Sequence, residues 1–286
     1  MGSYTLRKNM KKSTIILFVV LIIIIAMGIF YYCKPKDDNK PPEPTKIPEI
    51  IYEKNPDVKD PLRIGIPNVN LPPMVMWDKD GNLTGFEIEL IAETAKRLGV
   101  SYEIVPINPG TAREKLEDDE IDCAWGNMMD TGKQRLFYGM TDSYITIPQV
   151  VAVYEDSEIK DKKDVKNISV IMSTPAENLA DEDKLDINFT RVSASKDYEK
   201  TFEQLGDGYS DAVVCDKTVA DYMIKSDEKI KILDENAVEV RYSVAFRHTD
   251  EKMMLAVDKT LRDIFSEGIL SKLSLKWFER DYYIKN

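Results

Sequence analysis

The chain has 286 residues and a mass of 32.7 kDa, enough for one large domain or two modest lobes with a sizeable core. Its content of 43% apolar and 31% charged residues excludes a disordered or collagen-like chain. The net charge is −11, and because the first 36 residues hold six basic and no acidic side chains, the remainder carries −17. A surface that negative repels phosphate backbones, so we expect no nucleic-acid partner.

The histidine and cysteine content narrows the chemistry further. A single histidine, His248, excludes a multi-histidine metal cluster, and we expect neither a metal nor a cofactor. Three cysteines make no disulfide framework. Two of them, Cys123 and Cys215, lie in β-prone apolar runs and are predicted to be buried thiols.

Residues 14–32 form a run of nineteen residues without a charge, long enough to span a hydrocarbon core of about 30 Å. The basic cluster before it, in residues 1–13, predicts a cytoplasmic N-terminus and an extracellular remainder. Two interpretations stay open: an uncleaved membrane anchor, or a lipoprotein signal with Cys33 as the lipidated residue. The bulky residues 30–32 before the cysteine and the length of the run favour the anchor.

The segment after the run changes composition. Seven prolines alternate with charges between Lys34 and Pro61, so residues 33–60 are predicted to form a semi-extended extracellular stalk. The globular part is then residues 61–286, and its packed structure is expected to begin near Leu62.

Strand-like and helix-like segments alternate through the globular part. Residues 85–98 predict an amphipathic helix with Gly99 as its stop, a helix is expected after Cys215, and an apolar stripe from Met254 to Phe265 predicts another. The predicted strands, in chain order, are Arg63–Ile66, Tyr102–Pro106, Ile121–Trp125, Gln149–Tyr154, Ile168–Ile171, Asp211–Cys215 and Ile230–Leu233. This alternation indicates an α/β protein of two small lobes, each with a mainly parallel sheet covered on both faces.

Four segments resemble, in order, the family-3 extracellular solute-binding proteins. Residues 62–100 contain a Pro-Pro turn, a D-x-D-G hairpin and a Gly-Phe-acid motif before the first helix. Residues 120–145 end in a turn similar to Ser-Asp-Pro-Tyr, and residues 205–224 contain the pattern G-x-x-D-A-x-x-x-D. Residues 266–281 resemble the closing helix with Lys-Trp-Phe. Together the resemblance covers about residues 60–282.

The resemblance implies a two-lobed fold like that of the type II periplasmic binding proteins, with two strands crossing between the lobes. It places the first crossing near Pro148–Val151 and the return near Val240–Val244, so that lobe 1 is about 61–148 and 244–286 and lobe 2 is about 149–243. It also implies a cleft that holds a small polar ligand, typically an amino acid. Such clefts lie at the carboxyl ends of the strands.

By resemblance, Asp216 takes the place of the aspartate that binds the ligand ammonium. It ends an apolar run and precedes a predicted helix, so the alternative is a simple helix cap. The candidate for the ligand carboxylate is Arg135, but the family spacing Thr-x-x-Arg would end at Gln134. One residue rotates a helical side chain by about 100°, so either the turn at Gly132 absorbs the slip or Arg135 is a solvated surface residue.

The remaining candidates come from two turns and a strand end. Ser173 and Thr174 stand at a predicted helix start where hydroxyls and free N–H groups suit a carboxylate, with simple capping as the alternative. The other candidates by resemblance are Trp125, Asn127, Met129 and Leu71. Leu71 stands where the family commonly has a tyrosine, and such apolar replacements favour a ligand other than a standard basic or acidic amino acid.

These features predict a membrane-tethered, non-enzymatic receptor that closes on an amino acid or related solute and delivers it to an ABC permease. One alternative is a sensor ectodomain that works with a separate signalling partner. Another is an enzyme similar to the cyclohexadienyl dehydratases of the same fold, which would need a general acid such as Glu177 in the cleft.

Overall fold

The computed structural model describes residues 52–282. The cytoplasmic segment 1–13, the predicted span 14–32 and Cys33 lie outside the described residues. The chain divides into two units, Met1–Ile50 and Ile51–Asn286, and the second is the subject of the description below. Between residues 52 and 282, no helix is both long and apolar enough to cross a membrane.

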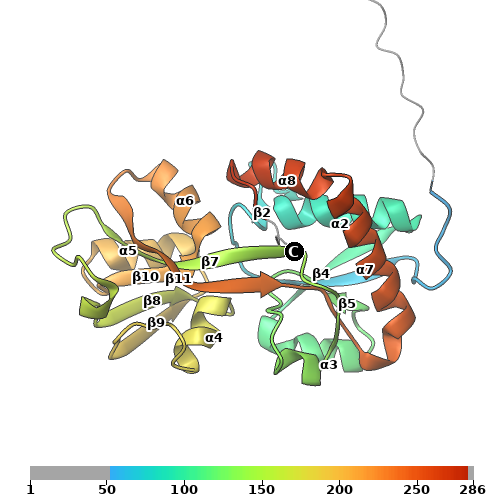
Figure 1. Cartoon of the computed structure of the whole chain (residues 1–286), viewed down its shortest axis with the longest axis horizontal. Helices are drawn as coiled ribbons and strands as arrows, with labels where there is room; N and C mark the ends of the chain where they lie inside the picture. The colour runs from blue at the N-terminus through green and yellow to red at the C-terminus, as the bar shows by residue number, and fades with distance from the viewer. Residues whose placement is uncertain (1–51, 283–286) are drawn as a thin grey trace, which may run out of the picture. The chain divides into compact units, whose positions relative to one another are not determined.

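Two five-stranded sheets form the centres of two lobes (Figure 1). The sheet of lobe 1 has the strand order β4 (Tyr102–Ile107), β1 (Leu62–Pro67), β5 (Cys123–Ala124), β12 (Ala245–Phe246) and β6 (Gly139–Met140). The sheet of lobe 2 has the order β11 (Ile230–Tyr242), β7 (Ile145–Tyr154), β10 (Ala212–Asp216), β8 (Asn167–Ile171) and β9 (Arg191–Ser195). A small hairpin joins β2 (Met76–Trp77) to β3 (Leu83–Thr84).

The pairing within the sheets confirms the predicted α/β class and adds antiparallel edges. The strands β1 and β8 pair in parallel with both of their neighbours. The strand β7 is antiparallel to β10 and β11, and β12 is antiparallel to β5 and β6. The antiparallel pairs arise where the chain crosses between the lobes and returns.

Helices cover the sheets. They are α2 (Phe86–Leu98), α3 (Ala112–Glu117), α4 (Pro175–Asp181), α5 (Tyr198–Gly206), α6 (Lys217–Ser226), α7 (Glu251–Ser266) and α8 (Ile269–Phe278). Short 3₁₀ turns lie at Pro109–Thr111, Gln134–Leu136, Lys162–Asp164 and His248–Asp250. The helix predicted before Gly99 is confirmed: Gly99 has the left-handed conformation, φ 67°, and its N–H bonds to the carbonyls of Ala95 and Lys96.

The two lobes are joined by β7 and β11, which run side by side across the centre of Figure 1. The return strand β11 is much longer than the predicted strand Ile230–Leu233, because it continues into the crossing segment as one strand. Its pairing with β7 is irregular between Ile232 and Val238.

Packed structure also begins earlier than expected. Val58, in the segment assigned to the stalk, is buried in the core of lobe 1, and the N–H of Asn55 donates to the carbonyl of Leu98. The predicted buried thiols are confirmed for Cys123 and Cys215, since both are free and buried.

Helix α5 of lobe 2 offers a test of the local structure. The carboxylate of Asp197 accepts the N–H groups of Glu199 and Lys200 at its N-terminus, whereas Asp207 lies at its C-cap. Asp197→Ala is expected to lower the free energy of unfolding by about 1 kcal/mol. Asp207→Ala should be neutral or slightly stabilising, because an acidic group there opposes the helix dipole. Urea unfolding of both variants measures this, and equal losses would contradict it.

Candidate functional site

Two carboxyl groups are buried together where the lobes meet. Glu87 lies in the first turn of α2 in lobe 1, and Asp216 is the last residue of β10 in lobe 2. Both are buried, with exposed fractions of 1% and 7%. Asp216 lies here because an apolar strand carries it to the carboxyl edge of the sheet, as the sequence predicts.

The Glu87 carboxylate is held by two aromatic donors. The indole Nε1–H of Trp125 donates to Oε2 at 2.9 Å, and the hydroxyl of Tyr144 donates to Oε1 at 2.7 Å. Trp125 follows β5 and is fully buried, so it lies behind the acid rather than on an open cleft wall.

The Asp216 carboxylate has its own donors. The hydroxyl of Tyr242, at the end of β11, donates to both oxygens at 2.8 and 2.7 Å. The side-chain amide of Gln149 in β7 also donates to Oδ1. Although Asp216 stands at the N-cap position of α6, its side chain makes no capping hydrogen bond, so a cap does not account for it.

The electrostatics of this pair are unfavourable without a cation. Burial raises the pKa of Glu87 to about 7, and the nearby charge of Asp216 adds to the rise. Burial also raises the pKa of Asp216 to about 6, against the lowering effect of the Gln149 and Tyr242 hydrogen bonds. Within the described range, no lysine, arginine or histidine makes an ion pair with either carboxylate. The pair therefore favours the binding of a positively charged group.

The space beside this pair is small because the lobes are in contact. A cavity of about 10 Å³ is lined by Glu87, Leu71 and Asn127 among others, and that volume holds about one water. Leu71 and Val69 of lobe 1 pack into a core cluster of lobe 2. Entry of an amino acid therefore requires the lobes to move apart.

Unpaired polar atoms surround the same place. The side-chain Nδ2 of Asn127 and Oε1 of Gln149 are buried without a hydrogen-bond partner in the part of the chain that the structure describes. Asn127 has the left-handed conformation, φ 57°. Met129 is buried, and its backbone forms a bridge with Tyr242. The Nδ2 atom of Asn127 and the Oε1 atom of Gln149 would each gain a hydrogen-bond partner from a polar ligand.

The turn at Ser173 and Thr174 offers fewer donors than expected. The backbone N–H of Ser173 donates to Glu177 at 2.5 Å, and the Thr174 hydroxyl donates to the carbonyl of Ile171 at 2.7 Å. Thr174 is the N-cap of α4 but makes no side-chain capping bond. The backbone N–H of Ser173 and the hydroxyl of Thr174 are thus engaged within the protein, and Glu177 holds the turn.

Arg135, the candidate for the ligand carboxylate, forms an ion pair with Asp130. Its guanidinium binds Asp130 through Nε at 2.6 Å and Nη2 at 3.0 Å, and it donates to the carbonyls of Met140 and Thr141. Burial raises the pKa of Asp130, but the hydrogen bonds from Arg135 and Ser143 outweigh it and hold that pKa below its ordinary value. The one-residue slip thus leaves Arg135 in an internal ion pair.

Sequence reasoning missed four members of the site: Glu87, Tyr144, Gln149 and Tyr242. Glu87 carries a signal, since it is the acid of the Gly-Phe-acid motif. Gln149 and Tyr242 carry none, because they reach Asp216 only through the pairing of β7 with β10 and β11.

Two α/β lobes joined by crossing strands, with polar groups at the junction, are the architecture of a two-lobed binding protein. The profile of the bacterial extracellular solute-binding proteins, family 3, matches residues 62–280, and the chain belongs to this family. The L-cystine-binding protein TcyA of Bacillus subtilis is 27% identical over 278 residues, which cover 95% of this chain and 99% of TcyA. The arginine-binding extracellular protein ArtP of the same organism is 26% identical over 206 residues, 70% of this chain and 80% of ArtP.

Solved structures agree with the fold. An ancestral arginine-binding protein bound to arginine has a TM-score of 0.69 and 26% identity, and the match covers 77% of this chain and 99% of that one. The ancestral amino acid-binding protein AncCDT-1, a precursor of cyclohexadienyl dehydratase, has a TM-score of 0.68 and 27% identity, with 76% and 95% covered. The predicted two-lobed fold is therefore confirmed.

Proposed function

We propose that this chain binds an α-amino acid between its lobes, with the ligand ammonium between Asp216 and Glu87. The observation that carries the proposal is the buried pair of carboxylates without a counter-ion in the described residues. One acid belongs to each lobe, so a cation between them is bound most strongly when the lobes are closed. Ligand binding and hinge closure are thus one event.

The acid pair also bears on the kind of amino acid. Two carboxylates against one ammonium leave an excess negative charge, which favours a ligand with a second cationic group. The named relatives bind arginine, which has an ammonium and a guanidinium, and cystine, which has two ammonium groups. This charge count outweighs the argument from Leu71 and the other apolar replacements against a basic ligand.

We assign the protein a transport role rather than an enzymatic one. The chain would be tethered to the membrane by residues 14–32 and would pass its ligand to an ABC permease. Membership of a solute-binding family supports this role. The dehydratase precursor AncCDT-1 is itself an amino acid-binding protein. Glu177, the candidate general acid, is engaged with the backbone of Ser173.

Calorimetry on the full chain in detergent tests the proposal. L-Arginine and L-cystine are compared with 5-guanidinopentanoate, the analogue of arginine without its α-ammonium. We expect saturable binding of at least one of the two amino acids. If that amino acid is arginine, removal of the α-ammonium should weaken binding by at least tenfold. Equal affinity for arginine and its analogue, or binding of neither amino acid, would contradict the proposed site.

A further inference from the structure

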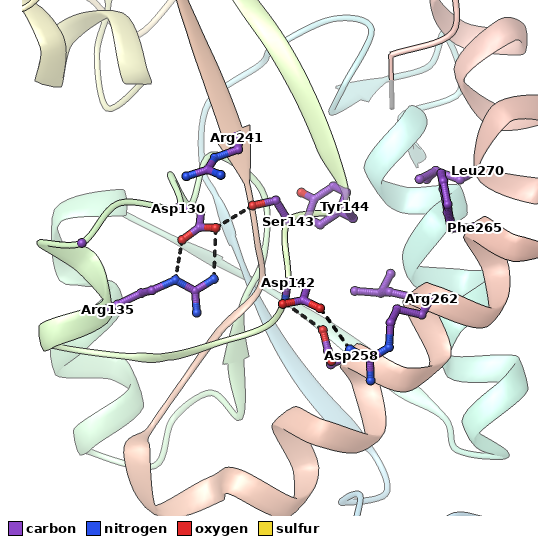
Figure 2. A pocket seen from close by; sticks show the side chains of 12 residues that line it. Asp130, Arg135, Asp142, Ser143, Tyr144, Arg241, Asp258, Arg262, Phe265 and Leu270 are labelled. Atoms are coloured by element: carbon purple, nitrogen blue, oxygen red, sulfur yellow. Dashed lines mark hydrogen bonds and ion pairs between the residues drawn. The ribbon is translucent and has the colours of Figure 1, made fainter. Parts of the chain in front are cut away.

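A much larger cavity lies beside the lobe 1 ends of the crossing strands (Figure 2). Its volume is about 590 Å³, within the range of small-molecule sites. It is bordered by the loop after β5, the loop before β7, the end of β11 and the helices α7 and α8. It adjoins the closed site at Tyr144, whose hydroxyl binds Glu87, but neither Glu87 nor Asp216 lines it.

Most of the charges in this cavity are already paired. Asp130 is bound by Arg135 and accepts the hydroxyl of Ser143 at 2.6 Å. On the other side, Asp258 binds Arg262 and accepts the backbone N–H of Asp142 at 2.7 Å. Arg262 also binds the carboxylate of Asp142, the third aspartate of the lining, at 3.1 Å. Each of the three carboxylates thus has an arginine partner, which reduces its repulsion of an incoming anion.

Arg241 is the exception. Its side chain is exposed and makes no hydrogen bond or ion pair within the described residues. Its backbone is fixed, because it pairs with Thr146 of β7 and its carbonyl accepts the N–H of Asp130 at 2.8 Å. A rigid strand therefore presents at the cavity a guanidinium without a hydrogen bond or ion pair in the described residues, although its charge helps to hold the pKa of Asp130 low. Such a group matches the geometry of a carboxylate.

The opposite side of the cavity carries apolar residues beside the Asp258–Arg262 pair. Figure 2 shows Arg241 near the Asp130–Arg135 pair, with Phe265 and Leu270 across from them. Leu261 and Leu270 are buried core residues, whereas Phe265 is 40% exposed. This side offers a hydrophobic surface for a ligand body.

We propose that this cavity binds a small organic carboxylate with an apolar body. The carboxylate lies on the Arg241 guanidinium, and the body lies against Leu261, Phe265 and Leu270. No ammonium is required, which separates this ligand class from the amino acid of the closed site.

The test uses 3-phenylpropanoate as the probe, with the full chain in detergent and a detergent blank. Calorimetry compares the wild type with Arg241→Gln and Arg241→Lys. Arg113→Gln is the matched control, since Arg113 is an exposed lobe 1 arginine outside the cavity, paired with Glu117. We expect saturable binding that Arg241→Gln weakens by about tenfold or more, Arg241→Lys weakens less, and Arg113→Gln leaves unchanged.

Three results would overturn the assignment: no saturable binding above the blank, equal affinity in Arg241→Gln, or an equal loss in Arg113→Gln. The same preparations are titrated with L-arginine and L-cystine. Binding of an amino acid without binding of 3-phenylpropanoate refutes the second cavity alone. The reverse result refutes the proposed function and leaves the second cavity in place.

Discussion

Asp216→Ala is expected to weaken the binding of an amine-bearing amino acid by roughly thirtyfold or more. The variant removes one of two buried carboxylates that would hold the ammonium, and it leaves the ligand charge buried with a weaker partner. Losses of about 2–5 kcal/mol are typical when one member of a buried charged pair is removed. Calorimetry on the wild type and the variant measures the change.

The isosteric variant Asp216→Asn separates binding from stability. An asparagine can still accept the Tyr242 hydroxyl, and it removes a buried charge that lacks a counter-ion in the described residues. We therefore expect the free variant to be at least as stable as the wild type at pH 8 while its ligand affinity falls. A large loss of stability would indicate that Asp216 serves the fold.

Arg135→Ala is the contrasting variant. Because Arg135 binds Asp130 and backbone carbonyls, its removal should affect amino-acid affinity much less than the loss of Asp216. The reverse order has a definite meaning. If Asp216→Ala binds as the wild type does and Arg135→Ala does not, the ligand lacks an ammonium, and an organic acid becomes the better assignment.

Amino-acid affinity is expected to fall on the order of a hundredfold between pH 8 and pH 5.5, about thirtyfold from Glu87 and about fourfold from Asp216. In the free protein the pKa is about 7 for Glu87 and about 6 for Asp216, and an ammonium favours the ionised forms. Ligand binding must therefore release protons from both acids, and each acid lowers the affinity by up to tenfold per pH unit below its own pKa. Calorimetry in buffers of different ionisation enthalpy measures both the affinity and the proton release.

Glu87→Gln provides the control for this pH dependence. It should remove the larger contribution, which begins near pH 7, and leave the roughly fourfold loss that belongs to Asp216 and begins near pH 6. An affinity that stays level or rises as the pH falls to 5.5 would refute the role of the acid pair.

Glu87 and Asp216 have the opposite effect on the stability of the free protein, which they lower as the pH rises. Each raised pKa means that the folded state keeps a proton that the unfolded state has already lost. Their contribution to stability is therefore greatest below their ordinary values of 4.5 and 3.8, and it declines as the pH rises to about 7 and 6. Bound ligand should reverse this trend by supplying the missing cation.

Local features of the chain were accessible from the sequence. The helix ending at Gly99 follows from a 3.6-residue apolar period and a stop residue, and both depend only on near neighbours. The placement of Asp216 follows from a short apolar run before a helix, which puts a polar residue at a sheet edge. The order of such segments along the chain also predicted the two-lobed α/β fold.

The partners of the side chains were decided only by the tertiary structure. Glu87 meets Asp216 because α2 of one lobe begins where β10 of the other lobe ends, although the two elements are far apart in the sequence. Tyr242 reaches Asp216 because β11 continues as one strand across the hinge. Arg135 binds Asp130, which lies in the same loop. Residue spacing determines which face of an element a side chain occupies, but burial, ion pairing and pKa depend on what the fold brings opposite that face.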